Sequence, residues 1–253
     1  MEYKKGHPLR IFEAFAGYGS QQLALNRLKE EYPEFDFISV GFSKIEPAAI
    51  TAFKALHGDV KNFGDITLID WEEVPDFDLF TMSSPCQDFS AAGKQAGGDE
   101  GSGTRSSLLW ECTKAIQIKR PRYVLFENVA AVASQKFVKG FNKWQRRLEG
   151  FGYVNFAQLI NSKDQGVPQN RLRLFMVSIL RTEDNPNPKY HFPKPFKLER
   201  CLADVLEEDV DESYFLSDEM LSRFCVKSQE EEEGGGIKEP VECDDFEDFF
   251  VGG

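Results

Sequence analysis

The sequence predicts an α/β fold, a doubly wound and mostly parallel sheet with helices between its strands. Short apolar runs alternate with helix-like segments along residues 9–181, which is typical of parallel sheets. A turn containing glycine follows the first apolar run and precedes the first helix. The 253 residues are enough for one such domain with a sizeable core and a short appendage.

Each strand is expected where a short apolar run meets polar or small residues. Such runs occupy residues 9–15, 35–42, 77–82, 123–126, 153–160 and 172–180. One further strand is expected to end at residues 64–66. Helices are expected at residues 21–30, 47–56 and 108–119. A fourth helix is indicated by an apolar stripe at intervals of four, three and four, formed by Phe137, Phe141, Trp144 and Leu148.

The chain beyond residue 182 is less regular. Prolines at residues 186–195 mark a boundary, and residues 198–226 are expected to hold two short helices. Residues 228–253 contain ten acidic residues and one lysine, and so carry nine of the twelve net negative charges. We therefore expect a main domain at residues 1–182, a small irregular or helical extension at 183–227 and a disordered acidic tail at 228–253.

Composition limits the possible classes of protein. No stretch approaches the ~18 consecutive apolar residues of a membrane helix, and the charged first ten residues do not resemble a signal peptide. The five cysteines are widely spread without a C-x-x-C pair, so we interpret them as reduced thiols with no disulfide and no metal site. We expect a cytoplasmic protein whose near-neutral body is free to present a basic face locally.

Cys86 is the central residue of the predicted site. The apolar run at residues 77–82 ends in small and polar residues, and Pro85-Cys86-Gln87 follows at the mouth of the resulting loop. A free cysteine most often packs in a core and is inert, so spacing alone assigns it no role. Glycine-rich residues 91–107 are expected to form a lid or a plain surface loop, and their position after Cys86 favours the lid.

Charged residues stand at the same edge of the predicted sheet. Glu127 follows one strand-like run, and Arg171 and Arg173 stand at the start of another. Together with Cys86 they suit attack on an electron-poor ring. A thiolate adds to C6 of a pyrimidine, a carboxyl group stabilises the charge at N3 and the amino edge, and C5 becomes nucleophilic enough to accept a methyl group. Arginine can hold the base oxygen or a phosphate, and it favours the thiolate.

A nucleotide-type crevice is expected beside these residues. A strand, a glycine turn and a helix bring backbone N–H groups close to a ligand, but many such turns bind nothing. An acidic residue about 20 to 30 positions after the turn often holds a ribose. The candidates are Glu46 and, less directly, the position occupied by Lys44.

Six short blocks follow one another in an order that is specific as a set. They are Phe15-Ala16-Gly17-Tyr18-Gly19, Gly64-Asp65-Ile66, Pro85-Cys86-Gln87, Gly103-Thr104-Arg105-Ser106-Ser107-Leu108-Leu109, Glu127-Asn128-Val129 and Gln169-Asn170-Arg171-Leu172-Arg173. In this order they resemble the cytosine-5 DNA methyltransferase family. The resemblance is strong over residues 9–181 and thin to about residue 226. It implies the Rossmann-like fold of S-adenosylmethionine-dependent methyltransferases.

The resemblance also implies a reaction and a cofactor. A methyl group would pass from S-adenosyl-L-methionine to C5 of cytosine in duplex DNA, through a covalent bond between Cys86 and C6 of a flipped base. The implied catalytic residues are Cys86, Glu127, Arg171 and Arg173. The implied cofactor contacts are Phe15, Gly17, Gly19, Glu46, Asp65, Ile66, Pro85 and Leu108. The family further implies a bacterial or phage protein of the restriction-modification type, with residues 91–107 closing over the base.

Two departures from the family change these expectations. The family usually has glutamate where Lys44 stands, and lysine has no acceptor for ribose hydroxyls, so we expect weaker cofactor binding or a rearranged ribose contact. After Arg181 nothing resembles the target-recognition domain, the later helix or the closing block of a full enzyme. The chain would then be one subunit of a split methyltransferase with a second polypeptide, or a truncated, inactive or minimal enzyme.

Other functions stay open at this point. A zinc nucleobase deaminase needs H-x-E and P-C-x-x-C, and neither His57-Gly58-Asp59 nor Pro85-Cys86-Gln87-Asp88-Phe89 supplies them. A tRNA cytosine-5 methyltransferase would share the cysteine, glutamate and arginines, although residues 98–109 look more like the bacterial and phage DNA type. A non-catalytic remnant of the cofactor fold that binds a partner is the third alternative.

Overall fold

The computed structural model describes residues 6–85 and 100–221 of the chain. Cys86 and residues 91–99 of the predicted lid therefore lie outside the described residues. The chain divides into two compact units, residues 1–198 and residues 199–253, and each is described by itself.

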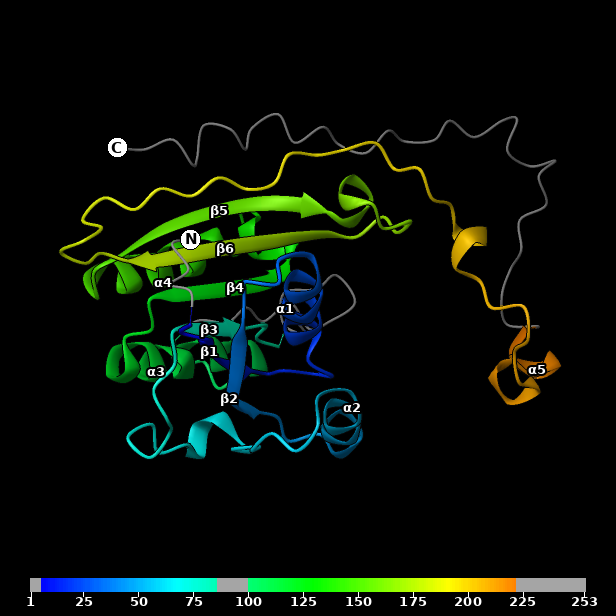
Figure 1. The fold of residues 1–253 in the computed structure, drawn as a ribbon, viewed down its shortest axis with the longest axis horizontal. Helices are drawn as coiled ribbons and strands as arrows, with labels where there is room; N and C mark the ends of the chain where they lie inside the picture. The colour runs from blue at the N-terminus through cyan, green and yellow to red at the C-terminus, as the bar shows by residue number, and fades with distance from the viewer. Residues whose placement is uncertain (1–5, 86–99, 222–253) are drawn as a thin grey trace. The chain divides into compact units, whose positions relative to one another are not determined.

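The first unit is built on one six-stranded sheet in the order β2-β1-β3-β4-β6-β5 (Figure 1). The strands are β1 (Leu9–Ala14), β2 (Phe37–Ser43), β3 (Leu79–Met82), β4 (Tyr123–Val129), β5 (Tyr153–Asn161) and β6 (Leu172–Leu180). Strands β2, β1, β3 and β4 run parallel, and β6 lies antiparallel to both β4 and β5. The predicted mostly parallel α/β sheet is confirmed.

Helices cover both faces of this sheet. They are α1 (Ser20–Glu31), α2 (Pro47–His57), α3 (Glu111–Lys119) and α4 (Val138–Gly150), with 3-10 turns η1 (Ile66–Leu68), η2 (Arg105–Trp110), η3 (Ala130–Ala133) and η4 (Ser162–Gln165). Leu25 of α1 packs on Ile11 and Leu79 on one face. On the other face α4 places Phe141 and Trp144 against Phe126, with ring centroids 5.8 and 5.3 Å away. The predicted apolar stripe of α4 is therefore core.

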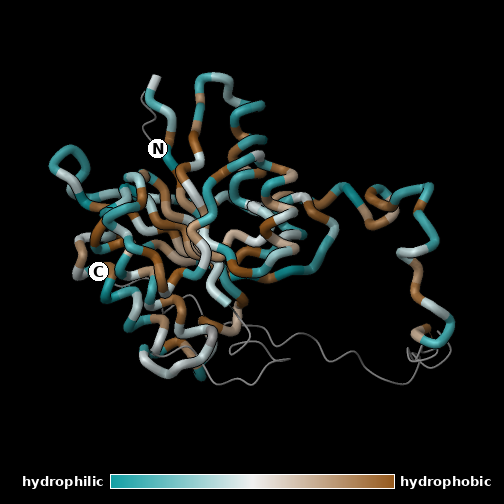
Figure 2. Tube along the Cα trace, turned by 90° about the horizontal axis from the view of Figure 1, so that it is seen from below, coloured by the Kyte–Doolittle hydropathy of each residue, from teal (hydrophilic) through white to brown (hydrophobic). Residues whose placement is uncertain are grey.

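A second aromatic group completes that buried face. The ring of Phe12 on β1 lies 5.2 Å from Trp71 and 5.4 Å from Phe77. Figure 2 shows hydrophobic residues concentrated in the strands of this unit. Burial of such rings is worth about 1.5–3 kcal/mol each, so this face contributes much of the driving force that holds the strand ends in register.

The expected strand ending at residues 64–66 is wrong. Residues 61–63 meet β2 only through an isolated bridge between Phe42 and Asn62. Gly64 then adopts a φ of +73°, and the carboxylate of Asp65 accepts the N–H of Thr67 to begin η1. The chain thus turns away from β2 after one bridge, and the described residues form six strands rather than seven.

Two helix expectations also change. The helix expected at residues 108–119 begins earlier, as η2 from Arg105, because the Thr104 hydroxyl accepts the N–H of Ser107 at 3.2 Å; the α-helical part begins at Glu111. In place of two short helices at residues 198–226, the described part of the second unit contains η5 (Leu202–Val205), η6 (Glu212–Tyr214) and α5 (Asp218–Leu221).

Part of the predicted extension packs on the first unit. The ring of Tyr190 lies 6.0 Å from Phe156 of β5, and the N–H of Phe196 donates to the carbonyl of Asp164 at 3.0 Å. The compact units accordingly divide at Leu198. The domain limits at residues 182 and 227 stay predictions, and the acidic tail lies outside the described residues.

Candidate active site

The turn between β1 and α1 has an unusual backbone. Phe15, Gly17 and Gly19 all have positive φ, at 56°, 58° and 82°. The N–H of Gly19 donates to the carbonyl of Ala16 at 2.8 Å, immediately before α1. A left-handed backbone costs a non-glycine residue about 1–2 kcal/mol, so its surroundings must hold Phe15 in this conformation. Such strain is typical of a ligand-binding turn.

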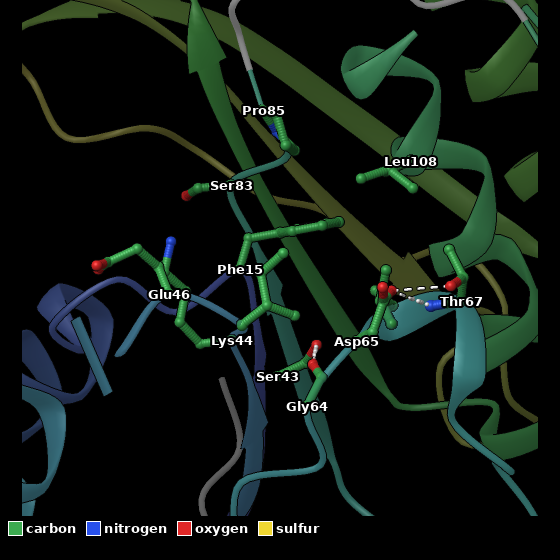
Figure 3. Close-up of a pocket in the computed structure, with 12 residues that line it drawn as sticks. Phe15, Ser43, Lys44, Glu46, Gly64, Asp65, Thr67, Ser83, Pro85 and Leu108 are labelled. Atoms are coloured by element: carbon green, nitrogen blue, oxygen red, sulfur yellow. Dashed lines mark hydrogen bonds between the residues drawn. The ribbon is translucent and has the colours of Figure 1, made fainter. Parts of the chain in front are cut away.

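A cavity of about 650 Å³ opens beside this turn (Figure 3). Its size falls within the range of about 300–1,000 Å³ found for small-molecule and cofactor sites. Two neighbouring segments contribute most of its lining: the end of β2 with the residues before α2, and the segment that leads into η1. The lining residues are Phe15, Ser43, Lys44, Ile45, Glu46, Gly64, Asp65, Ile66, Thr67, Ser83, Pro85 and Leu108.

The two acidic residues of the cavity already have partners. The Glu46 carboxylate accepts the N–H groups of Ala48 and Ala49 at 3.1 and 2.7 Å, and so caps the start of α2. Oδ1 of Asp65 accepts both the N–H and the hydroxyl of Thr67 at 2.9 Å. These bonds fix both carboxylates in place before any ligand binds.

Six of the eight predicted cofactor contacts line this cavity: Phe15, Glu46, Asp65, Ile66, Pro85 and Leu108. Gly17 and Gly19 do not line it, and they shape the turn instead. Lys44, which the sequence marks as a departure from the family, does line it. Sequence reasoning gave no role to Ser43, Thr67 or Ser83; Thr67 directly follows the Gly64-Asp65-Ile66 block, and Ser43 directly precedes Lys44.

The predicted catalytic edge contains a side-chain ion pair. Nε of Arg173 lies 3.2 Å from Oε1 of Glu127, and both side chains are about one-fifth exposed. The antiparallel register of β4 and β6 places Val129 opposite Arg173, which brings the two residues together. Arg171 is exposed, and its backbone N–H donates to Asn161; among the described residues no ion pair involves its side chain. The structure thus joins Glu127 to Arg173 and leaves Arg171 apart.

The segment that leads to Cys86 is held from two sides. The amide of Asn128 donates to the carbonyl of Ser84 at 3.0 Å, and the hydroxyl of Ser106 donates to the carbonyl of Pro85 at 2.9 Å. Both donors are buried. Sequence reasoning quoted Asn128 and Ser106 within motifs without giving either a role. Because Asn128 adjoins Glu127, this bond ties the backbone before Cys86 to the strand that carries Glu127.

Two buried ionisable groups lie outside the predicted set. The side chain of Glu13 is fully buried on β1, and burial raises its pKa to about 7. The signal in the sequence was an acid within the apolar run at residues 9–15. The thiol of Cys112 is also fully buried, and burial raises its pKa well above the ordinary value, so it is unreactive.

The comparisons with known proteins agree with this geometry. The sequence profile of the C-5 cytosine-specific DNA methylase family matches residues 9–247. The chain belongs to this family. The resemblance seen in the six blocks is thereby confirmed. The family match continues to residue 247, well past residue 181, where the strong resemblance ends.

Two named relatives illustrate the match. The type II methyltransferase M2.ScrFI of Lactococcus lactis subsp. cremoris is 38% identical over 267 residues, which cover 85% of this chain and 72% of the relative. The orphan methyltransferase M.Rho11sI of Bacillus phage rho11s is 31% identical, and the match covers 97% of this chain and 50% of the relative. Named methyltransferases of a bacterium and a phage are thus similar to this chain over most of its length, and the chain spans half of the second relative's length.

Solved structures show the same fold. The Dnmt2 methyltransferase of S. pombe superposes with a TM-score of 0.64 at 22% identity, and the match covers 85% of this chain and 65% of that one. At this identity the likeness concerns the fold. Within the described residues, no helix is long and apolar enough to cross a membrane, and no three potential metal ligands cluster.

Proposed function

We propose that the chain transfers a methyl group from S-adenosyl-L-methionine to C5 of cytosine in duplex DNA, after the base has flipped out of the helix. The observation that supports this best is the ion pair between Glu127 of β4 and Arg173 of β6. The residue after Glu127, Asn128, donates to the backbone of Ser84, two residues before Cys86. The carboxylate and the guanidinium thereby lie together at one edge of the sheet, and Pro85, the residue before Cys86, lines a cavity of cofactor size.

The proposed reaction assigns one task to each group. The Cys86 thiolate forms a bond to C6 of cytosine, and the electron pair of the C5–C6 double bond moves toward C5 and the N3 edge. Glu127 hydrogen-bonds N3 and the amino group and stabilises the charge that develops there. Arg173 orients Glu127 and holds the base oxygen, while exposed Arg171 is placed for a phosphate. Transfer of the methyl group to C5 leaves S-adenosylhomocysteine. A water molecule then takes the C5 proton, the electrons of that C–H bond re-form the C5–C6 double bond, and the C6–sulfur bond breaks to release the Cys86 thiolate.

The residues around the cavity fit S-adenosylmethionine, which when bound supplies an electrophilic methyl group. Phe15, Ile66 and Leu108 offer apolar surface for a flat base, and Lys44 and Asp65 offer a donor and an acceptor for hydroxyl and amino groups. We propose that all eight predicted contacts serve this ligand, with Gly17 and Gly19 acting through the shape of the turn. Lys44 then replaces the usual acceptor with a donor at the ribose.

We further propose that the three regions expected from the sequence have separate roles. Residues 1–182 form the catalytic and cofactor-binding domain, residues 183–227 the extension, and residues 228–253 a tail that avoids phosphate because of its charge. Target recognition by a second polypeptide is part of this proposal. It predicts that the chain alone binds cofactor and methylates DNA only when the partner is added.

A trapping experiment tests the reaction. The substrate is duplex DNA in which 5-fluorocytosine replaces every cytosine of one strand. The target cytosine is then labelled whatever recognition sequence the enzyme requires. Because fluorine cannot leave C5 as a proton does, the adduct persists. We expect a denaturation-stable complex that requires S-adenosylmethionine and is lost in Cys86→Ala. The matched control is Cys201→Ala, because Cys201 is an exposed free thiol in the other unit.

The arms of this experiment separate the alternatives. Trapping and tritium transfer on tRNA but not on DNA would move the substrate class to RNA. Sequence-specific DNA methylation by the chain alone would exclude the split enzyme. An adduct that survives Cys86→Ala would refute the proposed nucleophile. No adduct on either substrate, with candidate neighbouring polypeptides present, would favour a non-catalytic remnant.

The role of Glu127 gives a second prediction. Glu127→Gln keeps the shape and loses the charge, so methyl transfer should fall about 10²–10³-fold, as for removal of one transition-state donor elsewhere. Binding of S-adenosylhomocysteine should not change, because Glu127 does not line the cavity. Single-turnover tritium release and calorimetry measure the two effects. Exposed Glu183→Gln is the control, and an equal loss in both variants would count against the assignment.

A further inference from the structure

The end of β2 meets residues 61–63 over a very short ladder. The N–H of Phe42 donates to the carbonyl of Lys61 at 3.1 Å, and the N–H of Phe63 donates to the carbonyl of Phe42 at 2.8 Å. A parallel ladder that continued would next pair Lys44 with the backbone of Phe63 and Asp65. Backbone pairing would then continue between β2 and residues 61–65, along residues that line the cavity.

The side chain of Asn62 takes the place of that next rung. Its Oδ1 accepts the N–H of Lys44 at 3.1 Å, and its Nδ2 donates to the carbonyl of Lys44 at 2.9 Å. The same Oδ1 accepts the N–H of Gly64 at 3.0 Å. One amide therefore satisfies both backbone groups of Lys44 and one of Gly64. Without it, these half-buried groups would lack protein partners.

With the Asn62 side chain in place of a backbone rung, the ladder ends after one bridge while the two segments stay joined. Released from the ladder, the chain turns at Gly64, whose φ is +73° and whose carbonyl accepts the Ser43 hydroxyl at 2.7 Å. Ser43 and Lys44 line the cavity together with Gly64 and Asp65, and Ser43 lies directly beside Gly64 (Figure 3). Asn62 itself does not line the cavity, and its side chain joins Lys44 to Gly64.

We propose that Asn62 is a positioning residue that holds the Lys44 and Gly64 backbone in place along the cavity for the cofactor. The inference rests on the proposed function, because it concerns binding of S-adenosylmethionine at this same cavity. Asn62 acts through Lys44 and Gly64, and it carries no charge that would contact the ligand. Fixing the Lys44 backbone on both sides also fixes where its ammonium group can reach.

The test compares three variants by calorimetry with S-adenosylhomocysteine. Asn62→Leu has nearly the same size and removes all three bonds, so its Kd should rise at least about 10-fold. Asn62→Asp keeps both bonds that Oδ1 accepts and places an oxygen against the Lys44 carbonyl. Its Kd should therefore lie between those of the wild type and Asn62→Leu. With DNA and the proposed second polypeptide present, the KM for S-adenosylmethionine should rise while kcat stays within about 2-fold, because the Glu127–Arg173 pair is built by β4 and β6.

Asn155→Leu is the matched control. Its amide donates to the carbonyl of Gln145 at 3.1 Å and so also joins two elements, but β5 and α4 lie outside the cavity lining. Urea unfolding of every variant shows how much the side-chain amide bonds of Asn62 and of Asn155 contribute to the unfolding free energy. We expect both leucine variants to lose stability and only Asn62→Leu to lose affinity.

The outcomes separate this inference from the function on which it rests. If the wild-type chain binds no S-adenosylhomocysteine, the proposed cofactor is wrong. If the wild type binds and the folded Asn62→Leu binds equally well, the positioning role is refuted while the function stands. Equal losses of affinity in Asn62→Leu and Asn155→Leu would also refute it, because the effect would then be general loosening of the fold.

Discussion

Replacing Gly19 with alanine is expected to lower the stability of the fold and to disrupt the turn beside the cavity. A Cβ atom at this position would lie 2.4 Å from Nε2 of His57 and 2.8 Å from Cε2 of Phe53. Neither neighbour can move freely. Phe53 is fully buried and stacks on Phe42 at 3.9 Å, and Nε2 of His57 lies 3.0 Å from the carbonyl of Tyr18.

The backbone adds to this steric cost. Gly19 has a φ of +82°, where an alanine pays about 1–2 kcal/mol, and overpacking a filled site costs about 1–3 kcal/mol more. We expect Gly19→Ala to lose about 2–5 kcal/mol of unfolding free energy. We also expect it to bind S-adenosylhomocysteine at least about 10-fold more weakly, because Phe15 and the start of α1 shift together.

Gly17→Ala separates the two causes. Gly17 also has a positive φ, at 58°, but a Cβ atom there would meet nothing within 4 Å. This variant should therefore lose only the backbone part, about 1–2 kcal/mol in urea unfolding. Adding His57→Ala to Gly19→Ala should recover part of the loss by opening space. If Gly17→Ala and Gly19→Ala are equally destabilised, the clash with His57 and Phe53 is not the cause.

The stability of the chain should fall as the pH rises toward 8 because of Glu13. Its side chain is fully buried, and the backbone N–H of Gln22 offsets only part of the cost of burying its charge. Burial raises its pKa from 4.5 to about 7. The protonated form is therefore favoured by folding, and the stability linked to it is complete below about pH 4.5 and is lost as the pH rises through about 7.

Glu13→Gln should remove this dependence. A difference of about 2.5 pKa units corresponds to about 3 kcal/mol between pH 4 and pH 8. Relative to wild type, the glutamine variant should gain stability progressively from pH 5 to pH 8 in urea unfolding. Glu30→Gln, at an exposed position of α1, is the control and should run parallel to wild type. If the Glu13→Gln and wild-type curves also stay parallel, the buried carboxyl does not titrate in this range.

Features that depend on residues close together in the chain could be predicted from the sequence, whereas features that depend on distant residues could not. The parallel order of β1 to β4 could be predicted because alternating apolar runs are local signals. The strand expected near Gly64 could not be judged locally, because its fate depends on Asn62 bonding to Lys44, 18 residues away. Similarly, Asn128 reaches Ser84 across 44 residues, so its role could not be found from spacing.

The sequence by itself determined the family, the fold class and the kinds of chemical group available, because six ordered blocks and the apolar periodicity are written in the chain. Only the tertiary structure decided which of those groups meet. The antiparallel register of β4 and β6 brings Arg173, but not Arg171, to Glu127, and the Asn62 amide takes the next rung after a single bridge where a seventh strand was expected. These outcomes depend on distant segments packing together, and no local pattern encodes that geometry.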